Sequence, residues 1–186
     1  GQTNIYSTQF EAAQGYNSTL DLAGQNGWLA DGPGGNGLTT GLFPGEGQHA
    51  YIGFTNGVDR LYVYRRINFA PLAAGMPSVQ FTTLMSIEDS TNGEYDYFQW
   101  QVYNISGDRL FVIDFDVFAT KVSYFLDGGS GYIDTGVTFG LGATNTLTVT
   151  MNFASNRWSA TLNAALLATN QPITTTNKQL TLGDVD

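Results

Sequence analysis

The sequence predicts an all-β fold built as a two-sheet antiparallel β-sandwich. Apolar and polar residues alternate with a period of two along most of the chain, as in strands that bury one face. Turn residues separate these runs at intervals of roughly 8–12 residues, which gives about a dozen strands. Apolar residues make up 42% of the 186 residues, enough for one core. We therefore expect a single domain over residues 1–186.

The clearest alternating runs lie in the second two thirds of the chain. They span residues 60–69, 79–87, 96–104, 109–118, 146–153 and 157–163. The segments that follow residues 104 and 153 are short, so the runs on either side of each are expected to pair as antiparallel hairpins. Helix-like composition is confined to residues 70–76 and 162–168, which are too short and uncapped to predict helices. The Gly-rich N-terminal third is expected to form loops and edge strands.

Charge and composition exclude several classes of partner. The net charge is −9, the pI is about 4.2, and Lys and Arg together number only 7. Nucleic acids and anionic membrane surfaces are therefore unsuitable partners, because both require clustered basic residues. No run of about 18 apolar residues exists, so membrane insertion through a helix is not expected. The absence of cysteine excludes disulfides and thiolate chemistry. The sequence indicates no oligomeric state.

The stretch "GPGGNG" (32–37) matches the G-x-G-x-x-G pattern of dinucleotide-binding loops, and Asp59 follows about 20 residues after it. Such a loop must follow a buried strand and begin a helix. "LTTGLFPGEG" follows instead, with Pro44 and further glycines. Chance matches are also frequent in a chain with 23 glycines. We interpret the stretch as a surface loop of the kind that sometimes borders a ligand site.

Several segments resemble a known family. "FEAAQGYNSTLDLAGQNGW" is similar to the first segment of bacterial concanavalin A-like (laminin G-like) jelly-roll domains. The hairpins of "DYFQWQVYNISGDRLFVIDFD", "KVSYFLDGGSGYIDTGVTF" and "TLTVTMNFASNRWSATLNAALL" follow in the order of that superfamily, which includes lectins and glucanases. The resemblance covers nearly the whole chain. It implies a jelly roll of the secreted bacterial type, located outside the cell, in the periplasm or on the cell surface.

The same superfamily includes carbohydrate-binding modules, glycoside hydrolases, polysaccharide lyases and adhesion domains. Similar glucanases carry an E-x-D-x-E or E-x-D-x-x-E strand whose glutamates are the nucleophile and the acid/base. In "EYDYF", Glu94 and Asp96 share a face, but Phe98 and Gln99 stand where the last glutamate would be. We therefore assign no catalytic residue and lean towards a protein that is not an enzyme.

Two further aspartates, Asp114 and Asp116, share a strand face opposite the apolar residues of their run. They are acid/base groups, calcium ligands or part of a solvated face, and the last is commonest. Asp89, Asp127 and Asp134 lie near turns and are available for calcium, but their spacing forms no known calcium loop. His49 is the only histidine, so a histidine-pair zinc site is excluded. We assign no metal site and no cofactor.

Tyrosine, arginine and glutamine side chains alternate onto strand faces opposite the core. Aromatic rings stack on sugar rings, and amides and Arg hydrogen-bond hydroxyl groups. Equally, Tyr and Gln suit any exposed strand. Our predicted ligand-binding residues are Tyr62, Tyr64, Arg66, Gln99 and Gln101.

The resemblance and these faces together favour a non-catalytic, extracytoplasmic carbohydrate-binding or adhesion module with a polysaccharide or other glycan as its partner. Two alternatives stay open. One is a glycoside hydrolase or polysaccharide lyase that uses Glu94, Asp96 or the Asp114–Asp116 pair. The other is a structural cell-surface domain without a small ligand.

Overall fold

The structure is a computed structural model that describes residues 2–53, 60–89 and 96–186. Within these residues the regular elements are strands, apart from the 3-10 helix η1 (Ala12–Gln14). All strand pairings in the described chain are antiparallel. The chain divides into two compact units, Gly1–Ile67 with Ser90–Glu94 and Asn68–Asp89 with Tyr95–Asp186. The single domain over residues 1–186 stays a prediction.

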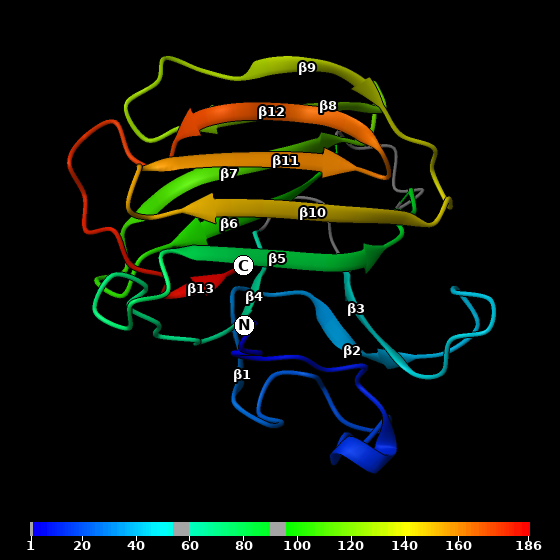
Figure 1. The fold of residues 1–186 in the computed structure, drawn as a ribbon. Helices are drawn as coiled ribbons and strands as arrows, with labels where there is room; N and C mark the ends of the chain where they lie inside the picture. Colours follow the sequence, from blue (N-terminus) through cyan, green and yellow to red (C-terminus); the bar gives the residue numbers. More distant parts are fainter. Residues whose placement is uncertain (1, 54–59, 90–95) are drawn as a thin grey trace. The chain divides into compact units, whose positions relative to one another are not determined.

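The larger unit is a sandwich of two sheets that share one core (Figure 1). The four-stranded sheet has the order β12-β11-β10-β5 and consists of β5 (Ser78–Met85), β10 (Asn145–Asn152), β11 (Arg157–Leu162) and β12 (Ala165–Pro172). The five-stranded sheet has the order β13-β6-β7-β8-β9 and consists of β6 (Tyr97–Tyr103), β7 (Arg109–Asp116), β8 (Lys121–Leu126), β9 (Ile133–Thr138) and β13 (Asp184–Val185). The predicted all-β, two-sheet antiparallel sandwich is confirmed.

The predicted hairpins are present as β6–β7 and β10–β11. Asn104 and Gly107 close the first turn through backbone hydrogen bonds, and the Asn152 side chain closes the second by accepting from the backbone N–H groups of Ala154 and Ser155. Short polar turns therefore set the strand register, as the sequence pattern indicates.

The centre of the sandwich is a stacked aromatic pair that joins the two sheets. The rings of Phe111 on β7 and Trp158 on β11 lie 4.2 Å apart, centroid to centroid, at an interplanar angle of 6°. Tyr124 on β8 meets the Trp158 ring edge-on at 5.3 Å. The indole N–H of Trp158 donates to the Pro172 carbonyl at 3.1 Å, so this buried polar group is satisfied.

β7 carries a β-bulge opposite the end of β6. Tyr103 pairs with Arg109 and Val102 pairs with Phe111, so Leu110 is the extra residue. Leu110 and Phe111 are both buried. The Arg109 guanidinium lies over the Phe125 ring at 4.9 Å. Phe125 follows the core residue Tyr124 on β8, so its side chain points to the outer face of the sheet. The bulge thus brings a cation to the outer face of the five-stranded sheet.

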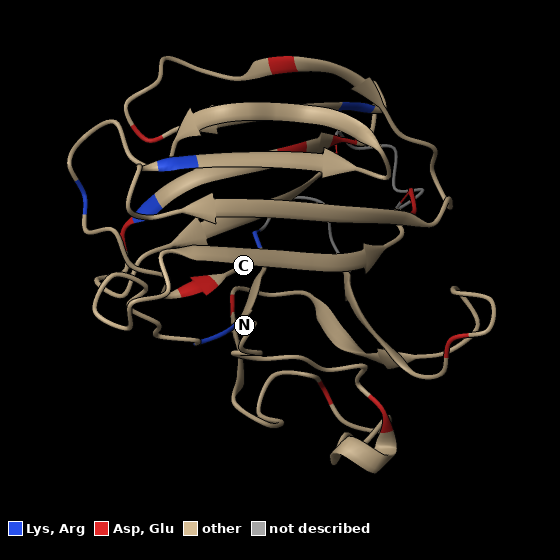
Figure 2. Ribbon diagram, in the orientation of Figure 1, with Lys and Arg blue, Asp and Glu red and all other residues tan. Residues whose placement is uncertain are grey.

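The two sheets differ in charge (Figure 2). The four strands of the first sheet contain a single charged residue, Arg157. The described strands of the five-stranded sheet carry both signs, with charged residues at Arg109, Asp114, Asp116, Lys121, Asp134 and Asp184. Their outer faces therefore offer different chemistry.

The smaller unit consists of two β-ribbons and an aromatic cluster. β1 (Trp28–Asp31) pairs with β4 (Tyr62–Arg65), and β2 (Gly35–Thr39) pairs with β3 (His49–Gly53). The Trp28 indole donates to the Tyr16 hydroxyl at 3.0 Å, and the Arg65 guanidinium lies 4.2 Å from the Tyr6 ring centroid. Burial and the hydrogen bond to Tyr16 raise the pKa of Tyr6 to about 12.

One local prediction needs correction, and a second is confirmed. Residues 35–37 of "GPGGNG" begin strand β2 instead of belonging to a loop, because the Asn36 side chain is buried and accepts from the Ala23 N–H at 2.8 Å. An added Cβ at Gly37 would lie 2.9 Å from the exposed Tyr51 ring, which would have to shift. As expected, neither helix-like segment is helical: 70–76 forms a turn, and 162–168 holds the end of β11 and the start of β12.

Removal of the central indole tests the core. Trp158→Ala takes away the stack on Phe111 and leaves a cavity between the sheets, so the free energy of unfolding should fall by about 3–5 kcal/mol. Denaturant unfolding followed by tryptophan-independent circular dichroism measures this change. Leu166→Ala is the control, because Leu166 is 58% exposed, and it should alter stability by less than about 0.5 kcal/mol. A loss below about 1 kcal/mol for Trp158→Ala would contradict the central role of the stack.

Candidate functional site

The outer face of the five-stranded sheet carries a row of polar and aromatic side chains along β6. Phe98, Trp100 and Val102 pack towards the core. Because neighbouring side chains on a strand point to opposite faces, the residues between and beside them point outwards. They are Tyr97, Gln99, Gln101 and Tyr103. The predicted outward placement of Gln99 and Gln101 agrees with this register.

These side chains form a chain of hydrogen bonds in which each residue donates to the next. The Tyr103 hydroxyl donates to Gln101 Oε1 at 2.7 Å, and Gln101 Nε2 donates to Gln99 Oε1 at 2.6 Å. Gln99 Nε2 then donates to Asp114 Oδ1 at 2.8 Å and to the Tyr132 hydroxyl oxygen at 3.2 Å. Every amide in the row has a defined orientation, because the chain ends on a carboxylate that only accepts.

Asp114 terminates the chain as a buried carboxyl group. Burial raises the pKa of Asp114 above its usual value; the hydrogen bond from Gln99 opposes this rise, and the charge of Asp116 adds to it. Burial and the charge of Asp114 also raise the pKa of Tyr132. Tyr132 therefore keeps its hydroxyl proton at neutral pH, and that proton is available for donation because its oxygen already accepts from Gln99.

Only part of this row is open to a ligand. Gln101 and Asp114 are each 6% exposed, whereas Tyr97 is 44% exposed and Tyr132 is 59% exposed. Gln99 is half-buried between them. The accessible surface is therefore an ordered amide flanked by two tyrosine rings, with Gln101 and Asp114 holding the amide in place.

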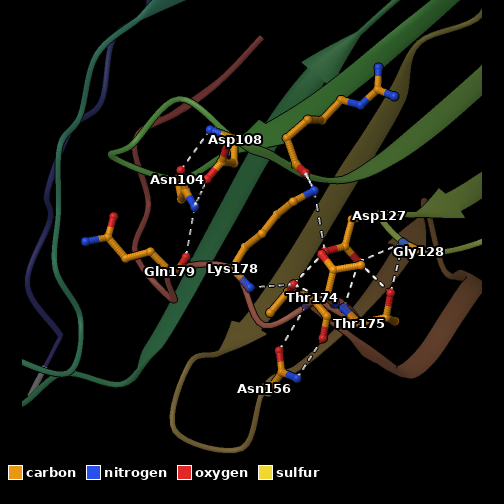
Figure 3. Close-up of polar contacts among 11 residues, drawn as sticks. Asn104, Asp108, Asp127, Gly128, Asn156, Thr174, Thr175, Lys178 and Gln179 are labelled. Carbon is orange, nitrogen blue, oxygen red and sulfur yellow. Dashed lines mark hydrogen bonds and ion pairs between the residues drawn. The ribbon is translucent and has the colours of Figure 1, made fainter.

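Tyr132 lies in the loop between β8 and β9, and its position depends on contacts at both sides. Its ring packs edge-on against Phe125 at 5.1 Å. At the start of the loop, the side chain of Asp127 is bound by the segment that follows β12 (Figure 3). We call this arrangement, Asp127 with Thr174, Thr175 and Thr176, the threonine clamp.

The threonine clamp satisfies both oxygens of the Asp127 carboxylate. Oδ2 accepts from the hydroxyls of Thr174 at 2.5 Å and Thr176 at 2.7 Å. Oδ1 accepts from the Thr175 N–H at 2.7 Å and from its hydroxyl at 2.8 Å. Burial alone would raise the pKa of Asp127, but the hydrogen bonds from Thr174, Thr176 and Thr175 outweigh it and hold that pKa well below its usual range. Lys178 Nζ adds an ion pair at 3.7 Å.

Tyr62, Tyr64 and Arg66, the other three predicted ligand residues, belong to the smaller unit. Tyr62 and Tyr64 share the face of β4 opposite the buried Val63. The Tyr64 hydroxyl donates to Asp31 Oδ2 at 3.2 Å, and the Arg66 guanidinium lies 5.8 Å from the Tyr64 ring centroid. The structure thus forms two groups from the predicted set, one on β4 and one on β6. That all five residues bind one ligand stays a prediction.

The candidate catalytic carboxylates have separate environments. Glu94 lies outside the described residues. Asp96 directly precedes β6, and its carbonyl accepts from the Val117 N–H at 3.1 Å. Asp116 shares the outer face with Asp114, and its Oδ1 accepts from the Ala119 N–H at 3.0 Å. The catalytic role of all four residues stays untested.

The residues considered for calcium are likewise dispersed. Asp127 is bound by the threonine clamp, and Asp134 Oδ1 accepts from the Gly136 N–H at 2.8 Å. Within residues 2–53, 60–89 and 96–186, no three His, Cys, Asp or Glu side chains gather into a possible metal site. His49 is the first residue of β3, and its Nδ1 lies 3.2 Å from the Gly47 carbonyl oxygen. In the same ranges no helix has the length and apolar character to cross a membrane.

Sequence reasoning missed Tyr132 as a site residue. It stands in "DGGSGYIDT", which has the composition of a turn. Its contact with Gln99 joins residues 33 positions apart. Only the pairing of β6, β7, β8 and β9 brings them together, and no local pattern encodes that order of strands.

One solved structure supports the fold, whereas two other comparisons find no match. No family model matches the chain, and no curated protein matches it. A solved structure named "Sialidase" is similar over 86% of this chain with a TM-score of 0.62 and 11% identity. The chain covers only 13% of that protein's length. A heptameric SAP-like pentraxin from Limulus polyphemus aligns over 56% of this chain and 61% of its own, at 11% identity and a TM-score of 0.31, too low to support an argument. The chain has a two-sheet antiparallel jelly-roll fold.

Loss of the Asp127 charge tests the threonine clamp. Asp127→Asn replaces one acceptor oxygen by an amide that faces donors, so stability at pH 7 should fall by about 2–3 kcal/mol. Because the folded-state pKa is depressed, the contribution of Asp127 is complete above its unfolded pKa of about 4 and is lost as the pH falls through the folded value. The difference between wild type and variant should therefore narrow below about pH 4.

Urea unfolding across pH measures both effects. Glu88→Gln is the matched control, since Glu88 is exposed and its Oε1 accepts from the Ser86 hydroxyl at 3.2 Å. It should change stability by less than about 0.5 kcal/mol. An Asp127→Asn protein as stable as wild type at pH 7 would show that the clamp does not support the fold.

Proposed function

We propose that the chain is a non-catalytic glycan-binding module that acts outside the cytoplasm. The observation that carries this proposal is the ordered Gln99 amide between the exposed rings of Tyr97 and Tyr132. A sugar ring presents an apolar face and directed hydroxyl groups, and this surface offers a complement to each. The low share of charged residues, 12%, supports an extracytoplasmic location.

The buried part of the row gives the site its pre-organisation. Gln101 and Asp114 fix both ends of the Gln99 amide, so little side-chain entropy is lost when a hydroxyl group binds. The similarity in fold to part of a protein named sialidase is compatible with this role, because that name denotes an enzyme of glycan chemistry. With 11% identity it adds no residue to the site.

A glycan array of neutral polysaccharides identifies the ligand, and calorimetry with that ligand tests the site. Tyr132→Ala removes a stacking surface worth about 1 kcal/mol, and Gln99→Ala removes the directed amide, so each should weaken binding by about five- to tenfold. Gln80→Ala, an exposed glutamine of the four-stranded sheet, should bind as wild type does. Binding that survives both site variants would refute this site, and an array without any binding would favour the structural cell-surface domain.

The second candidate function is glycan cleavage by a hydrolase or lyase. Its specific support is Asp114, a buried carboxyl group with a raised pKa beside Asp116 on the same face. A carboxyl group whose pKa is raised is better suited to act as a general acid, with a second carboxylate as its partner.

Reducing-sugar and unsaturated-product assays on the glycans that bind test this alternative. If it holds, Asp114→Asn or Asp116→Asn should reduce product release by about a hundredfold or more, and Asp116→Asn, which keeps the bond from Gln99 to Asp114, should leave binding unchanged. Asp96→Asn and Glu94→Gln test the remaining candidates in the same way. The enzyme hypothesis would be refuted if the wild-type protein formed no product, or if none of the four substitutions changed product formation.

A further inference from the structure

The outer face of the four-stranded sheet is a second polar surface, distinct from the row on β6. Trp158 and Val149 are buried in the core, so Arg157, Ser159 and Thr150 point the other way. In the β10–β11 register Thr150 lies opposite Ser159 and Asn152 lies opposite Arg157. Hydroxyl and amide groups thus occupy neighbouring positions across the strands, with one guanidinium among them.

This face is hollowed where β10, β11 and β12 meet. The depression has a volume of about 440 Å³, within the range of small-ligand sites. It is lined by Thr150, Asn152, Ser155, Arg157, Ser159 and Asn170. An irregularity in β12 helps to form it: Trp158 pairs with Gln171 but Ala160 pairs with Ala168, which leaves Asn170 unpaired in register. Asn170 adopts a left-handed backbone with φ of 49°.

The polar groups of the hollow present mainly donors. Asn152 Oδ1 is already used by the N–H groups of Ala154 at 3.0 Å and Ser155 at 3.1 Å, which leaves the Asn152 amide N–H₂ for a ligand. Ser159 Oγ accepts from the Asn170 N–H at 3.0 Å, so its hydroxyl proton remains to be donated. Arg157 uses one N–H for the Asn156 carbonyl at 3.1 Å and has further donors.

The charge of the hollow points to the same kind of ligand. Arg157 is the only charged residue on the strands of this sheet (Figure 2). Its side chain is exposed. Among the described residues it has no carboxylate partner within ion-pair distance. An Arg surrounded by donors and without an acid suits an anionic group, which it can bind through two parallel hydrogen bonds. The net charge of −9 disfavours long polyanions, so the ligand should be a short, hydroxyl-rich molecule that carries few anionic groups.

We propose that this hollow binds an acidic sugar residue, whose carboxylate or sulfate group pairs with Arg157 while its hydroxyl groups contact Thr150, Asn152 and Ser159. The hollow is a second glycan site on the face opposite the Gln99 site. The two sites select differently, because the Gln99 amide donates to the Asp114 carboxyl group, whereas the hollow is lined by the Arg157 guanidinium. One module then binds neutral and acidic sugars on opposite faces.

Calorimetry and NMR titration with three probes test the proposal: trigalacturonate, its methyl ester and a sulfated galactotriose. Trigalacturonate should bind, and the methyl ester, which has lost its charge, should bind at least tenfold more weakly. If the sulfated sugar binds as tightly as trigalacturonate, the site recognises negative charge in general. If it binds more weakly, the site recognises the planar carboxylate group specifically. Backbone resonances of residues 150–159 and Asn170 should shift on binding.

Arg157→Gln should reduce trigalacturonate affinity at least tenfold, and Arg157→Lys should restore only part of it, because Lys lacks the bidentate geometry. Lys121→Gln is the matched control: it removes the same charge from the exposed first residue of β8 and should have no effect. Gln99→Ala should also leave acidic-sugar binding intact, which separates this site from the proposed neutral one. Absence of acidic-sugar binding at millimolar concentration, or equal binding by Arg157→Gln, overturns the proposal.

Discussion

The stacked pair of Phe111 and Trp158 fixes the two sheets to each other, and both outer faces follow from it. With Trp158 turned into the core, its neighbours Arg157 and Ser159 must face solvent, since strand side chains alternate. Burial of Ile113 and Phe115 likewise puts Asp114 on the opposite outer face. A slip of one residue in β7 or β11 would exchange core and surface residues and destroy both polar surfaces. The aromatic core therefore determines where recognition chemistry can stand.

The two polar surfaces differ in how they achieve order. On β6 the amides of Gln99 and Gln101 are oriented by a hydrogen-bond chain that ends on Asp114. On β10 and β11 the side chains are oriented by local turns and by the irregular pairing at Asn170. The threonine clamp supports the first surface from a distance, because it holds the loop that carries Tyr132 to the segment after β12. A change at Asp127 can thus affect recognition without touching a ligand.

Much of the fold could be predicted from the sequence because period-two alternation is a local signal. The runs at 109–118 and 146–153 became β7 and β10 with the expected residues buried. Composition misled where context overrides it, as at the Gly-rich residues 35–37, which begin strand β2 because the buried Asn36 side chain accepts from the Ala23 N–H. The outward direction of Gln99 and Gln101 was predictable for the same local reason. The hydrogen-bond partners of Gln99 were not predictable, since Asp114 and Tyr132 reach it only through strand pairing. The hollow at Arg157 was not predictable either, because it depends on an irregular strand register that no local residue pattern indicates.

The central claim is that the accessible amide between Tyr97 and Tyr132 contacts a glycan. The most direct measurement is an NMR titration that follows the side-chain amide resonances of the glutamines while a neutral glycan identified by the array is added. The account predicts that the Gln99 Nε2 resonances shift most, with the ring resonances of Tyr97 and Tyr132, and that Gln80 and Gln179 on other surfaces stay unchanged. Shifts confined to residues away from β6 and the β8–β9 loop, with Gln99 unaffected at saturation, would contradict it.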